Sequence, residues 1–198
     1  MKKSFTTVLT LLLVTLVIAV FPTDAEARIY NDTFRLHILA NSDSKDDQEL
    51  KIKIRDKLLI KYGDILSDCL DMEHAESLCQ SLLPEINDEC EEWIRELGYD
   101  YSVRCELSRE WYETRDYENF SLPQGFYTSL RIIIGEGSGK NWWCVMYPPL
   151  CLSLATEDAP GDDTIINYTK EEIHLIEKNG YNIKFKSLEL ISKLFYKK

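Results

Sequence analysis

The predicted fold rests on one stretch, Tyr127 to Leu152, which reads YTSLRIIIGEGSGKNWWCVMYPPLCL. Apolar side chains recur at every second position along Leu130–Ile134, which is the period of a strand with one buried face. Three glycines at 135, 137 and 139 then provide the backbone freedom that a tight polar connection needs. Because 142–147 again reads as extended, we predict a β-hairpin with a long glycine-rich loop.

The end of this stretch carries two adjacent tryptophans, Trp142 and Trp143. Neighbouring residues of a strand point to opposite faces, so both rings cannot enter one core. We expect one ring to pack inside and the other to form an aromatic surface with Tyr147 and 148–150. Aromatic surfaces of this kind are enriched at the centres of protein interfaces. A sheet that is covered on both faces is the alternative.

The chain begins with the pattern of a secretory signal peptide. Two lysines precede the apolar run Val8–Phe21, and the small-residue triplet Ala25–Ala27 follows it. We predict cleavage after Ala27, so that 1–27 is a signal peptide and 28–198 is the exported domain. The run is shorter than the ~20 residues of a usual membrane span, so an uncleaved anchor is the alternative.

The composition is acidic, with 34 Asp and Glu against 23 Lys and Arg and a formal net charge of −11. Such a chain is a poor candidate for binding nucleic acid or for coating an anionic membrane. Much of the acid lies between positions 71 and 100. We interpret it as the solvated face of a helix, with a docking surface for a basic partner as the alternative.

Six cysteines follow the predicted leader, and export would permit disulfides. Cys144 and Cys151 form the best pair, provided that the chain doubles back at Pro148–Pro149 to bring them together. Cys79 and Cys90 share a helix face but lie about 16 Å apart, so they are expected to be small core residues. No cysteine or histidine spacing is typical of a zinc site, and no metal or cofactor is predicted.

The rest of the chain predicts a single domain of the α+β class with a mixed, mainly antiparallel sheet packed with several helices. An early strand carries Arg35 and His37 on its polar face, and Asn41–Ser44 then caps a helix. We expect that helix to end at Gly63. Its Asp47, Lys51 and Arg55 would be solvated ion pairs. The further predicted elements are a helical region over 72–97 that Pro84 kinks or splits, a strand over 101–107, a turn at 122–125, a helix capped by Thr169, a short strand over 183–186 and a terminal helix from Ser187.

Two sets of motifs resemble those of the stage II sporulation protein R family. The first set covers 35–56 and contains Arg35-Leu36-His37, Ala40-Asn41-Ser42-Asp43-Ser44, Asp47-Gln48 and Arg55-Asp56. The second contains Leu130-Arg131, Gly135-Glu136-Gly137, Asn141-Trp142-Trp143-Cys144-Val145 and Pro148-Pro149-Leu150-Cys151. The resemblance spans most of the predicted mature chain, while 64–98 and the segment after Leu152 agree only in general character.

The resemblance implies a specific function. Members of this family are exported from the forespore into the space between the two septal membranes. There they signal to a membrane-bound aspartic protease of the mother cell, which then cleaves the precursor of sporulation sigma factor E. On this reading the protein is a ligand and not an enzyme. After loss of its leader it would act close to a membrane without spanning it.

We expect the contact surface to combine the aromatic corner with the polar cluster of the early strand and the loop that follows it. The predicted contact residues are Arg35, His37, Asn41, Asp43, Arg131, Glu136, Asn141, Trp142, Trp143, Pro148 and Pro149. A small exported hydrolase is the alternative, with Cys144 as nucleophile, His37 as base and Asn41 or Asp43 as orienting group, or with Glu136 near Asp43 as the acid and base. A carbohydrate-binding module that stacks sugars on its aromatic side chains is a third.

Overall fold

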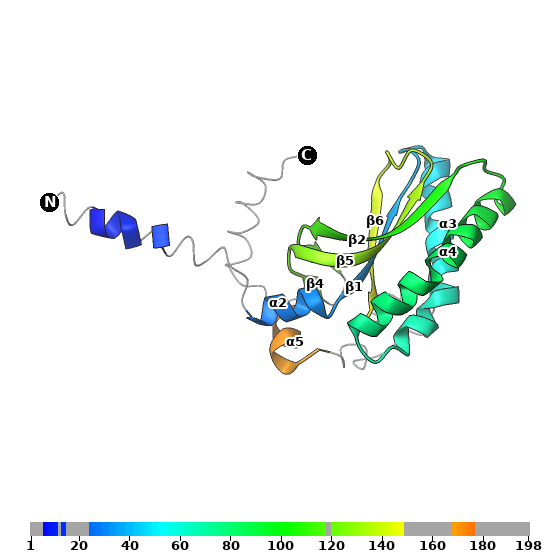
Figure 1. Cartoon of the computed structure of the whole chain (residues 1–198). Helices are drawn as coiled ribbons and strands as arrows, with labels where there is room; N and C mark the ends of the chain where they lie inside the picture. Colours follow the sequence, from blue (N-terminus) through cyan, green and yellow to red (C-terminus); the bar gives the residue numbers. More distant parts are fainter. Residues whose placement is uncertain (1–5, 12, 15–23, 118–119, 149–167, 177–198) are drawn as a thin grey trace. The chain divides into compact units, whose positions relative to one another are not determined.

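A computed structural model describes residues 6–11, 13–14, 24–117, 120–148 and 168–176 (Figure 1). The chain divides into two compact units, each described here by itself. The larger unit comprises Tyr30–Trp111 and Phe126–Tyr168, and the smaller comprises Met1–Ile29, Tyr112–Gly125 and Thr169–Lys198. Within the described ranges, no helix combines the length and the apolar character that crossing a membrane requires.

A four-stranded sheet with the order β2-β5-β1-β6 forms the centre of the larger unit (Figure 1). Its strands are β1 (Phe34–Leu39), β2 (Val103–Tyr112), β5 (Gly125–Ile134) and β6 (Asn141–Tyr147). β1 runs parallel to β5 and antiparallel to β6. The sheet is mixed and mainly antiparallel, so the predicted α+β class is confirmed.

The predicted hairpin is wrong in one respect, because β5 and β6 are not neighbours in the sheet. β1 lies between them and pairs with both. All six residues of β1 are buried, which suits an interior strand better than an edge strand. The local pattern identified both strands, but it contained no information about an early segment that inserts between them.

Two long helices pack with the sheet, α3 (Lys45–Ser67) and α4 (Met72–Glu96) (Figure 1). Ser44 caps α3 as predicted, since its side chain accepts a hydrogen bond from the N–H of Asp47. The helix does not end at Gly63, which is buried inside it. The buried face continues to Leu66, and this packing offsets the roughly 1 kcal/mol that an internal glycine costs.

Helix α4 is a single helix in which Pro84 is internal and exposed. Its buried residues lie on both sides of the proline, from Ala75 to Ile94, so packing holds the two halves together. Gly98 follows its end with a φ of 87°, which is a left-handed stop of the kind that we expected at Gly63. Cys79 and Cys90 are buried free thiols on this continuous helix, as predicted.

In the smaller unit, β3 (Arg115–Asp116) pairs with β4 (Ser121–Leu122), and α5 spans Lys170–Ile176. Thr169 caps α5 as predicted. Its N–H donates to Glu172 Oε2 at 2.7 Å, and its Oγ1 accepts from the N–H of Glu172. Glu172 also pairs with Arg28 of α2 (Asp24–Asn31), at 2.7 Å. Most of the apolar run 8–21 and residues 149–167 lie outside the described residues, and so do the strand and the terminal helix expected after residue 182.

Candidate functional site

Two loops of the larger unit are joined by hydrogen bonds. One loop, 41–44, connects β1 to α3, and the other, 135–140, connects β5 to β6. The N–H of Glu136 donates to Asn41 Oδ1 at 3.0 Å, and the N–H of Lys140 donates to Asp43 Oδ1 at 2.7 Å. The N–H of Gly139 donates to the carbonyl of Ala40 at 2.9 Å. We call this arrangement the joined loops.

Two of the glycines are needed for the close approach of these loops. A Cβ atom on Gly135 would lie 2.3 Å from Asn41 Oδ1, and one on Gly139 would lie 2.2 Å from the backbone oxygen of Ser42. Both distances are far below van der Waals contact, so only glycine fits at either position without a shift of the facing loop. The glycine-rich sequence therefore serves close contact between the two loops, with a side chain at Gly135 and with the backbone at Gly139, in addition to turn formation.

Side chains of the first turns of α3 form hydrogen bonds with the joined loops. Asp47 accepts hydrogen bonds from Asn41 Nδ2 at 3.0 Å and from Ser42 Oγ at 2.5 Å. Burial raises the pKa of Asp47, but these hydrogen bonds and that of Tyr101 outweigh it and lower the pKa. Lys51 donates to the carbonyl of Lys140 at 2.9 Å. Asp47 and Lys51 are both only 4% exposed, so the prediction of solvated ion pairs is wrong for them.

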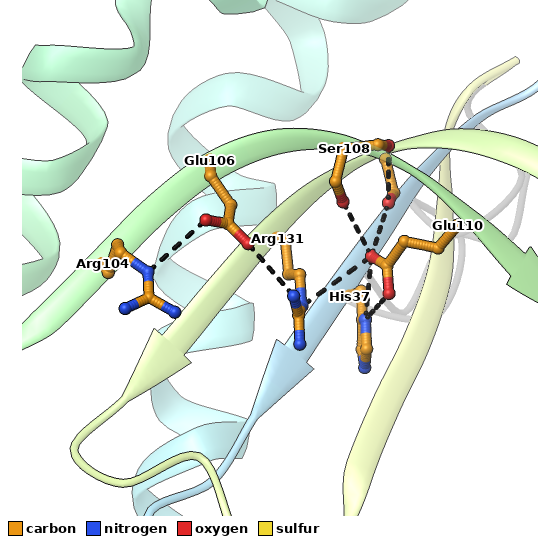
Figure 2. A network of polar contacts seen from close by, with 7 residues as sticks. His37, Arg104, Glu106, Ser108, Glu110 and Arg131 are labelled. Carbon is orange, nitrogen blue, oxygen red and sulfur yellow. Dashed lines mark hydrogen bonds and ion pairs between the residues drawn. The ribbon is translucent and has the colours of Figure 1, made fainter. Parts of the chain in front are cut away.

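A second polar network lies on the face of the sheet that carries His37 (Figure 2). Nδ1 of His37 is 3.2 Å from each carboxylate oxygen of Glu110. Ser108 and Ser129 donate to Glu110 Oε1 at 2.9 and 3.0 Å. Arg131, which is opposite His37 in the register, donates to Glu106 at 3.0 Å.

This network keeps Glu110 ionised. Burial raises the pKa of its carboxyl, but the hydrogen bond and charge of His37, together with Ser108 and Arg131, lower the pKa to about 2. Arg35, two residues before His37, is fully buried on the same face, with its guanidinium 4.9 Å from the ring centre of Tyr127. These groups stabilise the sheet, and they are not an exposed polar cluster.

The two adjacent tryptophans lie on opposite faces of the sheet, as predicted. Trp143 is paired with His37 in the register and stacks on it, with ring centres 5.4 Å apart and planes at 19°. Trp142 is on the helix side, where the guanidinium of Arg55 lies 4.5 Å from its ring centre. Both tryptophans are half-buried. The sheet is thus covered in part on each face, which is the alternative that the sequence left open.

The expected nucleophile and base are not brought together. Leu36 and Cys144 are paired in the register of β1 and β6, and so are His37 and Trp143. Because side chains alternate between faces, Cys144 and His37 point to opposite sides of the sheet. The predicted pairing of Cys144 as nucleophile with His37 as base, in the hydrolase alternative, is therefore wrong. Cys144 itself is buried, and its predicted disulfide partner, Cys151, lies outside the described residues.

The predicted contact residues fall into separate groups. The joined loops and the start of β6 bring together Asn41, which is half-buried, and three exposed residues, Asp43, Glu136 and Asn141. Arg35, His37 and Arg131 belong to the sheet face, so the single polar cluster expected from sequence is two sites. Tyr147 is 4% exposed and Pro148 is buried, so this part of the expected aromatic surface is not at the surface. Pro149 lies outside the described residues.

Several site residues were not singled out from sequence. Glu110 and Ser129 sit at the centre of the sheet-face network, and Lys51 anchors the joined loops. The predicted strand stopped at 107, whereas β2 continues to Tyr112. Extending its alternation from Glu106 through 108 to 110 would have placed Glu110 on the face of Arg131. Across the described residues, no group of three or more acidic, histidine or cysteine side chains is suited to hold a metal ion.

These features define an α+β protein in which two loops at one end of a mixed sheet are joined by hydrogen bonds. The family described as stage II sporulation protein R matches residues 30–157. The stage II sporulation protein R of Bacillus subtilis (strain 168) is 33% identical over 186 residues, covering 84% of this chain and 83% of the relative. No solved structure matched the chain. The chain belongs to the stage II sporulation protein R family, which confirms the resemblance.

Proposed function

We propose that this protein is exported from the forespore and activates a membrane-bound aspartic protease of the mother cell, which then processes the precursor of sporulation sigma factor E. Membership in the stage II sporulation protein R family is the observation that carries this proposal. The leader pattern supports export, and the family match begins at residue 30, three positions after Ala27, where we predict cleavage. The protein acts as a ligand, without catalysis of its own.

The joined loops are the contact surface that we favour for the protease. Asp43, Glu136 and Asn141 are exposed there, while the backbones beneath them are fixed by hydrogen bonds. A pre-organised surface loses little conformational entropy on binding, which favours a specific complex. Activation then requires that the ligand bind the active arrangement of the protease more tightly than the inactive one.

The test is cleavage of the sigma-factor precursor in a bacterium that carries the protease, the precursor and the full chain with its own leader. Glu136→Lys and Asn141→Arg change exposed side chains of the contact surface without touching the backbone bonds that join the loops. We expect each to reduce the cleaved fraction by roughly tenfold, which corresponds to about 1.4 kcal/mol of lost binding. Glu92→Lys is the matched control for Glu136→Lys, since it makes the same charge change on an exposed position of α4.

Secreted amounts and the folding of each variant are measured in parallel, so that a loss of signal is attributed to the surface. If the parent chain produces no cleavage in the presence of the protease, the proposed function is wrong. If the parent is active and both loop variants match it, the function stands and the contact surface is wrong.

A further inference from the structure

Among the described residues, four cysteines are free thiols that the proposed function does not use: Cys69, Cys79, Cys90 and Cys105. Two of them meet where α4 packs on β2. Asn87 Oδ1 of α4 accepts the N–H of Cys105 at 3.1 Å, which brings this part of β2 against the helix. Cys90 lies three residues after Asn87, and residues at this spacing share a helix face. Cys90 therefore faces Cys105 across this contact, and a hydrogen bond between the two thiols is the largest cause of the raised pKa of Cys90.

The surroundings of the two thiols differ in a way that matters for their chemistry. Cys90 is fully buried, whereas Cys105 is half-buried. A reagent in solution can therefore reach Cys105 but not Cys90. A disulfide holds its two sulfurs at about 2 Å, so the two side chains must move closer than hydrogen-bonding distance for the bond to form.

We propose that Cys90 and Cys105 are a disulfide site of this protein, oxidised by exchange with a small-molecule or protein disulfide. This inference concerns a covalent bond between α4 and β2, and it does not depend on the protease or on the contact surface. Sequence spacing did not suggest it, because the two cysteines belong to different elements.

The exchange runs in two steps. The Cys105 thiolate attacks one sulfur of the reagent disulfide, and the other reagent sulfur leaves as a thiolate. The Cys90 thiolate then attacks the Cys105 sulfur of this mixed disulfide and expels the second reagent sulfur. The two protons lost by the cysteines pass to the two leaving thiolates, and the two electrons reduce the reagent to two thiols.

The acidities of the buried thiols agree with this order of events. The hydrogen bond with Cys105 and burial both raise the pKa of Cys90, so it is a poor first nucleophile and a slow second one. Burial raises the pKa of Cys79 to about 12, which keeps it a thiol at neutral pH. Cys79 therefore serves as a matched control on the same helix.

The experiment uses the native full chain in buffers of reduced and oxidised glutathione, followed by quenching and alkylation of the remaining thiols. Digestion after glutamate places each of the four cysteines on a separate peptide, with Cys90 in 90–91 and Cys105 in 97–106. We expect these two peptides to appear linked, about 2 Da lighter than their sum, and to separate on reduction. The oxidised chain should also unfold at a higher urea concentration than the reduced chain.

Cys79→Ser should retain the linked peptides and the parent's shift of the urea midpoint, whereas Cys105→Ser should lose the linked peptides and show a smaller shift than the parent. The linked peptide is read in the parent chain, so the result does not depend on the folding of any variant. The proposal is overturned if Cys105 links to Cys79 instead. It is also overturned if Cys90 and Cys105 are still alkylated as free thiols at a ratio of reduced to oxidised glutathione that oxidises ordinary protein dithiols.

Discussion

Replacing Gly139 by alanine tests whether the two loops depend on backbone contact. The backbone of Gly139 has no positive φ, so alanine is conformationally allowed there and only the close contact opposes it. The new Cβ would lie 2.2 Å from the oxygen of Ser42 and 2.5 Å from its carbonyl carbon. These are backbone atoms, so the loop itself must move, by about 1 Å to reach ordinary contact.

A shift of this size breaks the short hydrogen bonds beside Gly139. The bonds from Gly139 to Ala40 and from Lys140 to Asp43 are 2.9 and 2.7 Å long, and that from Ser138 to Asn41 is 3.2 Å. At about 0.5–1.5 kcal/mol for each of the three bonds, their loss lowers the free energy of unfolding by roughly 1.5–4.5 kcal/mol. Urea denaturation followed by tryptophan fluorescence and by circular dichroism measures this value.

Gly98→Ala is the control for the general cost of losing a glycine. Gly98 has a φ of 87°, and a Cβ added there would meet no atom within 4 Å, so its substitution should cost about 1 kcal/mol from backbone strain alone. The reasoning is refuted if Gly139→Ala costs no more than Gly98→Ala. It is also refuted if the 139 variant keeps full stability while its loops stay joined.

Two further predictions concern the buried charges. The pKa of Glu110 is lowered to about 2, so its contribution to stability is full above about pH 4.5 and is lost as the pH falls toward 2. The free energy of unfolding of Glu110→Gln should therefore decrease less than that of the parent over this pH range, by on the order of 2 kcal/mol. Glu92→Gln is the control and should show the same decrease as the parent. If Glu110→Gln and the parent lose the same free energy between pH 4.5 and pH 2, the role given to the network is contradicted. Lys51→Met should cost about 1–3 kcal/mol in urea denaturation, because the Lys140 carbonyl and Gln48 lose their donor. The exposed Lys53→Met should stay within about 0.5 kcal/mol of the parent, and a similar loss in both variants would argue against the anchoring role.

Short-range patterns in the sequence predicted the elements well and their assembly less well. Alternation identified the two strands around the glycine-rich loop, and Ser44 was found because a cap is a local feature. The position of β1 between β5 and β6 could not be read in this way, since it depends on pairing between segments far apart.

For the candidate site, too, the sequence predicted which residues belong to it but not how they are assembled. The motif residues Asn41, Asp43 and Glu136 were identified from sequence, and the structure places them in one pair of loops. The burial of Asp47 and Lys51 could not be foreseen, because a charge ladder on a helix is normally solvated. Only the folded structure reveals that the joined loops lie over the turn of α3 that carries Asp47 and Lys51.

The interior place of β1 has a consequence for how this chain can be made. Phe34 pairs with Thr128 and with Tyr147, which are 94 and 113 positions further along the chain. Contacts between such distant segments form slowly, since a long loop must close first. The sheet cannot be completed until the ribosome has passed β6, so the emerging polypeptide stays open through most of its synthesis. The export that we propose would be favoured by this delay, because translocation requires an unfolded polypeptide.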